Sequence, residues 1–319
     1  MLPLYEAKMI HQFDHRWATY DGRLDTKGNP VARDVTHDEK RDPHFTALPR
    51  YWVPGGEVAR TLPDVSDRRW LFGWRDIARS TDERTTIAAG FPFSGVGNKL
   101  PLIVAASGPS WMLQVALSSF AADYAARTKV ASTSLNFFYV RQFPVHGPDA
   151  ANSDCPWDPD LALRDWLRVR ALELTYTAWD LAPFAEDLGD IDPTTGAVNP
   201  PYVWDDERRS WLRAELDAAF FHLYGIDRDD AAYILDTFPI VRRHDEEQHG
   251  EYRTKNRILA IYDAMAVAAG QSAGTTSVPV GEGSASTTRP YRTVLDPPPG
   301  HGPRHERSSL PRSTDWSAP

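Results

Sequence analysis

The sequence predicts an α+β protein: a β-containing first half (residues 1–150), a helical region (residues 151–270) and a disordered tail (residues 271–319). Before residue 150, short apolar runs are broken by Gly, Pro, Asp and Ser, a pattern typical of short strands joined by long loops. Between residues 160 and 270, apolar residues recur at the spacing of a helix face. In the last 49 residues, 27 are Pro, Gly, Ser or Thr, which leaves too little apolar surface to offset the entropy of ordering.

In the first half, we expect strands where apolar residues lie together, over residues 70–74, 100–106 and 135–140. A helix is expected over residues 110–128, because Met112, Ala116 and Phe120 recur at helical spacing. A connector rich in Pro, Asp and Asn, residues 147–160, marks the expected boundary between the two halves.

In the helical region, the first helix is predicted over residues 161–174, and shorter and longer helices over 231–235 and 252–268. Between them, a helix is predicted from Asp205–Asp206, whose charge suits a helix N-terminus, to Gly225. Its expected core residues are Trp211, Leu216 and Phe220. The charged residues 244–249 are interpreted as a solvated loop.

One stretch of the tail differs from the rest. The segment from Arg289 to Gly300 contains a run of three prolines, Pro297 to Pro299. Such a run favours polyproline II, so this stretch could dock as an extended arm.

Composition and charge limit the function classes. The 319 residues contain no run near the roughly 18–20 apolar residues of a membrane helix, and the N-terminus lacks an apolar signal core. The single cysteine, Cys155, excludes an internal disulfide framework and a cysteine-based zinc site. We therefore expect a cytoplasmic protein with no membrane partner.

The net charge of −9 is unevenly distributed. Residues 1–150 hold 18 Lys and Arg against 16 Asp and Glu, whereas residues 151–319 hold 17 against 28. An acidic balance argues against nucleic-acid binding only for the second half. The first half can still present a basic face to phosphates.

The string Asn199-Pro200-Pro201-Tyr202 spells the catalytic loop of amino-directed DNA methyltransferases. In that loop the Asn side chain and the first Pro carbonyl accept from the target amine, and the aromatic ring stacks on the flipped base. The chemistry needs the loop at the end of a buried strand. Here residues 190–196 read as a turn, so a Pro-rich turn before a helix is the alternative interpretation.

No other motif completes an active site. The pair His11 and His15 has i, i+4 spacing but no following Glu of the zinc-protease kind, and the residues His244 to His249 lack ligand spacing. The sequence contains no Walker-type loop or nucleophile elbow. We therefore assign no catalytic, metal-binding or cofactor-binding residue.

Polar and basic segments of the first half carry the side chains used for phosphate positioning and base reading. A solvated surface is the other interpretation of the same composition. The candidate DNA-binding residues are Arg75, Arg79, Ser80, Thr81, Arg84, Thr85, Asn98, Lys99, Arg127, Lys129, Ser134 and Asn136.

Several longer strings, taken in order, resemble a known family. They include LYEAKMIHQFDHRW from Leu4, WRDIARSTDERTTIAA from Trp74, GVGNKLPLI from Gly95, SSFAADYAARTKVASTSLNFFYVRQFPV from Ser118, WDLAPFAEDLG from Trp179 and ERRSWLRAELDAAFFHLYGIDRDDAAYILDTFPIVRR from Glu207. Together they resemble the C-terminal, TaqI-like specificity region of large restriction–modification-type adenine-specific DNA methyltransferases of phage-defence systems. The resemblance runs through most of residues 1–270.

The resemblance implies a DNA target-recognition role. In the family, a catalytic domain with the S-adenosylmethionine loop and its own Asn-Pro-Pro-Tyr precedes this region, so the implied partners are double-stranded DNA and that catalytic domain or subunit. The cofactor would belong to the catalytic domain, and this chain would hold none. A truncated gene, a split-gene subunit and a misassigned start all remain open. Two other functions also remain open: a protein–protein adaptor of a defence complex, and a stand-alone methyltransferase using Asn199 to Tyr202.

Overall fold

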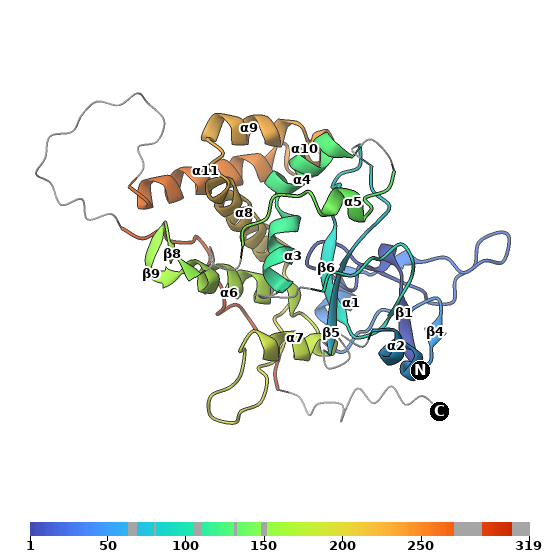
Figure 1. The fold of residues 1–319 in the computed structure, drawn as a ribbon. Helices are drawn as coiled ribbons and strands as arrows, with labels where there is room; N and C mark the ends of the chain where they lie inside the picture. Colours follow the sequence, from blue (N-terminus) through green and yellow to red (C-terminus); the bar gives the residue numbers. More distant parts are fainter. Residues whose placement is uncertain are drawn as a thin grey trace, which may run out of the picture.

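The computed structural model describes residues 1–62, 69–79, 81–104, 110–130, 133–147, 152–270 and 289–307. Small sheets gather in the N-terminal half, and helices dominate after residue 160, which confirms the predicted α+β class (Figure 1). Residues 271–288 and 308–319 of the predicted disordered tail lie outside the described residues.

The N-terminal sheets are short. A three-stranded sheet has the order β4-β1-β7, with β1 (Leu2–Tyr5) antiparallel to β4 (Trp52–Val53) and parallel to β7 (Gly95–Val96). Strands β2 (Ala18–Thr19) and β3 (Arg33–Asp34) form a separate antiparallel pair. Three short helices accompany them: η1 (Ala7–Met9), α1 (His37–Arg41) and α2 (Gly55–Thr61).

A buried hairpin confirms the predicted strand at residues 70–74. β5 (Trp70–Trp74) pairs antiparallel with β6 (Ala88–Pro92). Leu102, within the expected strand 100–106, forms only an isolated bridge to Gly73, and residues 105–106 lie outside the described part. The approach is so close that a Cβ on Gly73 would lie 2.5 Å from the carbonyl oxygen of Pro101, so only glycine fits there.

The predicted helix over residues 110–128 forms as two helices. Helix α3 (Ser110–Ser118) ends before Ser119, and α4 (Phe120–Lys129) begins after it. The Ser119 hydroxyl accepts from the Ala122 N–H at 3.2 Å and caps the new N-terminus. The serine therefore breaks a pattern that looks continuous from its apolar residues alone.

The predicted strand over residues 135–140 is wrong. Residues 137–140 form the short helix α5 (Phe137–Val140), and the Asn136 side chain accepts from the Phe138 N–H at 3.0 Å. This capping bond satisfies a donor that a strand would have needed to pair with a neighbour.

The C-terminal helices largely follow their predicted positions, after a small hairpin of β8 (Asp154–Cys155) and β9 (Asp158–Ala162). Asp205 caps the second long helix by accepting from the Arg208 N–H at 2.8 Å, and Gly225 follows its end with φ of +65°. The elements are α6 (Leu163–Thr175), η4 (Trp179–Leu181), α7 (Ala182–Asp187), α8 (Asp206–Leu223), α9 (Arg228–Asp236), α10 (Pro239–His249) and α11 (Arg253–Ala268).

The prediction of a solvated loop at residues 244–249 is wrong, because these residues belong to α10. Pro239 occupies the first turn of α10, where its missing N–H costs nothing, and Gly250 ends the helix with φ of +75°. The charged side chains between them lie mostly exposed on a helix that packs against α11.

The main hydrophobic core crosses the predicted boundary at residue 150. Side chains of β5, β6, α3 and α4 pack in one cluster with those of α6, α8, α9 and α11. Figure 1 shows α3 between the β5–β6 hairpin and the helices of the second half. Of the three expected core residues on α8, Leu216 and Phe220 are each 3% exposed, whereas Trp211 lies at the edge of the cluster.

Residues 289–307 form an extended arm that packs on the helical region. This confirms the docked arm expected for residues 289–300, whereas the expectation of disorder is wrong for this part of the tail. The Tyr291 N–H donates to the carbonyl of Trp157 at 2.8 Å, and its hydroxyl donates to Glu215 at 2.9 Å. Farther along, the Gly300 N–H donates to Glu173 on α6 at 2.9 Å. Buried hydrogen bonds compensate here for the low apolar content.

Candidate nucleic-acid interface and adjoining polar cleft

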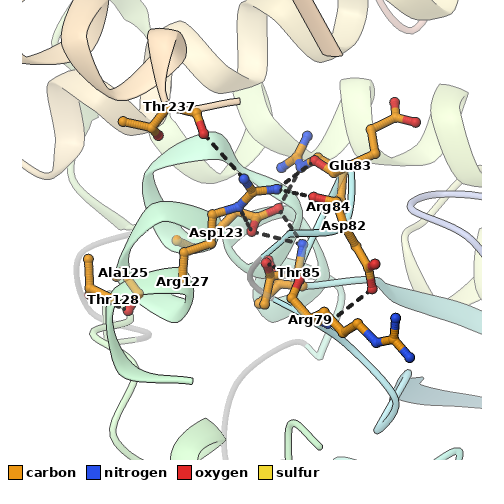
Figure 2. Close-up of polar contacts among 12 residues, drawn as sticks. Arg79, Asp82, Glu83, Arg84, Thr85, Asp123, Ala125, Arg127, Thr128 and Thr237 are labelled. Atoms are coloured by element: carbon orange, nitrogen blue, oxygen red, sulfur yellow. Dashed lines mark hydrogen bonds and ion pairs between the residues drawn. The ribbon is translucent and has the colours of Figure 1, made fainter. Parts of the chain in front are cut away.

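Asp123 on α4 is a fully buried carboxylate surrounded by three of the predicted DNA-binding residues (Figure 2). The Arg84 Nε donates to one carboxylate oxygen at 2.6 Å, and the Thr85 N–H lies 3.0 and 3.2 Å from the two oxygens. The Arg127 Nε approaches at 3.5 Å. The adjacent residues Arg84 and Thr85 therefore meet Arg127, from α4 itself, at one internal anion that lies 39 residues from Arg84 in the sequence.

Both guanidinium groups also donate to backbone carbonyls. Arg84 donates to the Ser118 carbonyl at 2.7 Å. Arg127 donates to the carbonyls of Asp82, Glu83 and Thr237 at 2.5, 2.8 and 3.3 Å, and burial lowers its pKa. These contacts fasten the 81–85 loop to α4 and to the end of α9. The two side chains are only 9% and 10% exposed, so in this structure both arginines mainly stabilise the fold.

Arg75 is also used internally. Its Nε and Nη2 donate to the carbonyl of Ile10 at 2.9 and 2.5 Å, and burial lowers its pKa to about 10. The side chain joins the end of β5 to the N-terminal segment.

A second buried carboxylate, Asp76, joins two other predicted residues near the surface. The Lys99 Nζ and the Ser134 hydroxyl each donate to it at 2.6 Å. Burial alone would raise the pKa of Asp76, but these hydrogen bonds lower it below its usual value. Lys99 itself stays half-exposed, so its charge remains available at the surface.

Exposed aromatic side chains lie beside this pair. Phe137 and Phe138 are 52% and 70% exposed, and the Phe137 ring packs edge-on against Trp74 with centroids 5.2 Å apart. Ile77, which bridges to Ser134, is also half-exposed. We use the name "α5 surface" for the patch formed by Ile77, Lys99, Ser134, Asn136, Phe137 and Phe138.

The other predicted residues lie on the exterior or outside the described range. Arg79, Thr81 and Asn98 are exposed, and the Arg79 side chain extends away from Asp123 (Figure 2). Lys129 is exposed and donates to the Gln142 carbonyl at 3.1 Å. Ser80 lies outside the described residues.

The Asn-Pro-Pro-Tyr string is engaged in internal contacts. The Asn199 amide donates to Asp190 at 2.9 Å. Tyr202 is 1% exposed, and its hydroxyl donates to the Gly300 carbonyl at 2.9 Å while Arg304 covers its ring at 3.7 Å. The C-terminal arm thus closes this turn, and neither side chain is free to meet a flipped base or to serve beside S-adenosylmethionine.

Two groups of histidines are considered as metal ligands in the sequence, His11 with His15 and residues 244–249, and neither is assigned. The His15 Nε2 donates to the Asp180 carboxylate at 2.8 Å, and the His11 ring lies tilted against Trp17 with centroids 4.4 Å apart. His244 on α10 pairs with Glu83 at 3.4 Å. Within the described ranges, no group of three or more His, Cys, Asp or Glu side chains converges on a point where a metal could bind.

A polar cleft lies between the N-terminal half and helices α8, α10 and α11. Its volume is about 430 Å³, and it shares the lining residues His11, Gln12, His37, Asp206 and Arg213 with a second hollow of about 260 Å³. We name the two hollows together the "Arg213 cleft". Sequence reasoning did not single it out, although Arg209, Arg213 and Asp217 follow one another at four-residue spacing beside the apolar stripe of α8, a signal of charges on a packed face.

In the described part of the chain, no helix has the length and apolar content needed to cross a membrane. Comparison of the sequence and structure with protein-family models, curated proteins and solved structures gives no match.

Proposed function

We propose that the chain is the DNA target-recognition part of an adenine-specific DNA methyltransferase of the restriction–modification type, and that its α5 surface faces the duplex. The α5 surface is the observation that carries the proposal. It joins exposed aromatic rings, a lysine and amide or hydroxyl groups in the half of the chain with a positive balance of charge. The resemblance of residues 1–270 to the specificity region of such enzymes supports the same assignment.

Each kind of side chain on the α5 surface has a use at a duplex. Lys99, with the nearby Lys129 and Arg79, can neutralise phosphates, which supplies affinity independent of sequence. The amide of Asn136 and that of Asn98 can pair with base edges, which supplies sequence preference. An exposed ring such as that of Phe138 can stack on a base or enter a base step.

The buried residues among the predicted DNA-binding residues are not part of the proposed DNA contact. Arg75, Arg84, Thr85 and Arg127 direct their donors at protein atoms, so their substitution would report on folding before it reported on DNA. The phosphate contacts that remain in the proposal are Arg79, Lys99 and Lys129.

An adaptor function is the second candidate, because the chain also has an exposed apolar hollow. A space of about 390 Å³ between α4 and α9 is lined by Tyr124, Tyr224, Ile226 and Tyr233, and Tyr233 is 63% exposed. Exposed apolar surface of this kind is typical of protein–protein contact. A stand-alone methyltransferase has no such support, because Asn199 and Tyr202 are held inside the protein.

Duplex binding by the full chain tests the first proposal. Fluorescence anisotropy with a labelled random-sequence duplex, measured from about 50 mM salt upward, gives both the affinity and the salt slope. Arg79→Gln and Lys129→Gln should each reduce the slope by roughly one, and Phe138→Ala should weaken binding by about 1–3 kcal/mol. Lys27→Gln, at an exposed lysine of the same half, is the matched control.

Two outcomes would reject the proposal. If the wild-type chain does not bind duplex at low salt, the adaptor function becomes the better assignment. If Arg79→Gln, Lys129→Gln and Phe138→Ala all bind like Lys27→Gln, another face of the molecule contacts DNA. Calorimetry with S-adenosylmethionine is a separate check: we expect no binding, and binding that Asn199→Ala abolishes would favour the stand-alone enzyme.

A further inference from the structure

Arg213 lines a polar hollow and is a cation with no bonding partner among the described residues. It projects from α8 into the Arg213 cleft, and it forms no hydrogen bond, ion pair or ring contact with any residue in the described ranges. Solvent reaches the side chain, yet protein surrounds it closely enough that desolvation lowers its pKa. The side chain is exposed, and its guanidinium group has no protein acceptor among the described residues.

The carboxylates nearest to Arg213 are already occupied by other donors. Asp217 accepts from the Phe120 N–H at 2.8 Å. Asp206 is 2.6 Å from His37, and Glu83 is 3.4 Å from His244. Although all three attract the Arg213 charge, none lies within salt-bridge distance of it.

The other cations of the cleft differ from Arg213 in this respect. Arg84 is paired with Asp123, and its charge repels that of Arg213. Arg253 and Arg257, on the α11 wall, both bind Glu207, so two positive charges share one carboxylate. An anion entering the cleft would therefore meet one guanidinium group that has no partner among the described residues, and a pair of arginines that share one carboxylate. The carboxylates of Glu83, Asp206, Asp217 and Asp245 line the same hollow.

His11 supplies a neutral polar group at the junction of the two hollows. Burial lowers its pKa to about 3, so the imidazole is uncharged near neutral pH and carries one N–H donor. Its ring contacts that of Trp17 in a tilted arrangement, with centroids 4.4 Å apart, and it lines both hollows together with Arg213.

We propose that the Arg213 cleft binds a phosphate group, with the Arg213 guanidinium as its principal ligand and the His11 imidazole as a second donor. The planar guanidinium fork matches two oxygens of a phosphate, and such charge-assisted bonds are the strong ones in a partly desolvated site. The volume of about 430 Å³ falls in the range of small-molecule sites, so a phosphorylated small molecule fits as well as a bare ion. A backbone phosphate of DNA offers the same chemistry. The site does not rest on the proposed function.

Phosphate-dependent stabilisation of the full chain tests the site. Thermal unfolding is compared in potassium phosphate and in potassium chloride of equal ionic strength, because a ligand that binds only the folded state raises Tm. The variants are Arg213→Gln and, as a matched control, Arg243→Gln at an exposed arginine of α10. In chloride, Arg213→Gln should unfold at the wild-type temperature, since Arg213 makes no bond within the described residues.

We expect phosphate to raise the Tm of the wild type and of Arg243→Gln, and Arg213→Gln to bind phosphate roughly ten- to a hundredfold more weakly. Titrations with inorganic phosphate, adenosine monophosphate and a short duplex then identify the source of the group. An Arg213-dependent response to the duplex alone would indicate a DNA backbone phosphate, and one to either small ligand would indicate a free phosphorylated molecule.

Three results would overturn the proposal. The first is a wild-type chain that responds to none of the three probes. The second is a phosphate response that Arg213→Gln and Arg243→Gln share equally. The third is a large loss of Tm for Arg213→Gln in chloride, which would show that Arg213 serves the fold.

Discussion

Replacing Asp123 with Ala should lower the free energy of unfolding, because it removes most of the bonds between the 81–85 loop and α4. The carboxylate is fully buried and receives the Arg84 Nε at 2.6 Å, the Thr85 N–H at 3.0 Å and the more distant Arg127 Nε at 3.5 Å. Removing it leaves the buried Arg84 guanidinium without its carboxylate and the Thr85 N–H without an acceptor.

The size of the effect follows from burial. Breaking a buried ion pair by deleting one partner costs about 3–5 kcal/mol, because the remaining charge stays uncompensated in a poorly hydrated place. Arg84 keeps its bond to the Ser118 carbonyl and its contact with the Phe120 ring, which lie 2.7 and 4.0 Å away, so we expect the lower part of this range. At about 2–4 °C per kcal/mol, a loss of about 3 kcal/mol lowers Tm by roughly 6–12 °C.

Urea denaturation followed by circular dichroism measures the loss directly. Asp82→Ala is the matched control, because Asp82 is an exposed carboxylate on the same loop. The double variant Arg84→Met, Asp123→Ala should recover part of the stability, since it removes the stranded charge together with its partner.

A loss below about 1 kcal/mol for Asp123→Ala would refute this reasoning. It would mean that the cluster behaves as a surface pair and that Arg84 and Arg127 can turn to solvent. These two arginines would then return to the set of DNA contacts.

Three further predictions concern the helical region. Phe220→Ala should cost about 3–5 kcal/mol and Trp211→Ala distinctly less, as measured by urea denaturation, because Phe220 is 3% exposed and Trp211 lies at the edge of the core; equal losses would contradict this ranking. Burial raises the pKa of Asp217 to about 6, so the folded chain holds this proton more tightly than the unfolded chain, and the resulting stabilisation is complete below about pH 3.8 and lost as the pH rises through 6. Asp217→Asn should therefore gain stability relative to the wild type as the pH rises from 4 to 7, by at most about 3 kcal/mol, and a Tm difference that does not change with pH would be evidence against the raised pKa. Arg304→Ala should cost roughly 1–3 kcal/mol and increase proteolysis of the arm, because both Arg304 nitrogens bind Asp190 at 2.9 Å; an unchanged cleavage rate would show that the arm is held elsewhere.

Local patterns predicted most helices, because each depended on residues close in sequence. The cap at Asp205, the apolar stripe of α8 and the stop at Gly225 all lie within one helix and its ends. The errors also have local causes. An aromatic and β-branched run suggested a strand at residues 135–140, but the Asn136 cap turned its end into a helix. Charge alone suggested a loop at residues 244–249, where Pro239 and Gly250 are the better signals.

The candidate site was less predictable, because charge in the sequence does not reveal whether a charge faces solvent. Arg79 and Arg84 occur in one basic segment, yet Arg79 is exposed and Arg84 is buried against Asp123. The deciding partner lies 39 residues away in the sequence. Such a pair follows from tertiary packing, so composition could indicate the segment but could not separate its members.

Three charged residues on the face of α8 between the two halves differ in their contacts, and the difference explains why the Arg213 cleft can bind an anion. Arg209, Arg213 and Asp217 follow one another at four-residue spacing. Arg209 donates to the carbonyls of Leu174 and Phe13, and Asp217 accepts from a backbone N–H of α4, so the outer two charges hold the N-terminal half against the helical region. Arg213 lies between them and has no such bond within the described residues. The fold therefore pairs Arg209 and Asp217 with protein atoms and leaves Arg213 between them facing a polar space of about 430 Å³, where an anion can bind. Because this space lies between the two halves of the chain, binding there would stabilise the contact between them.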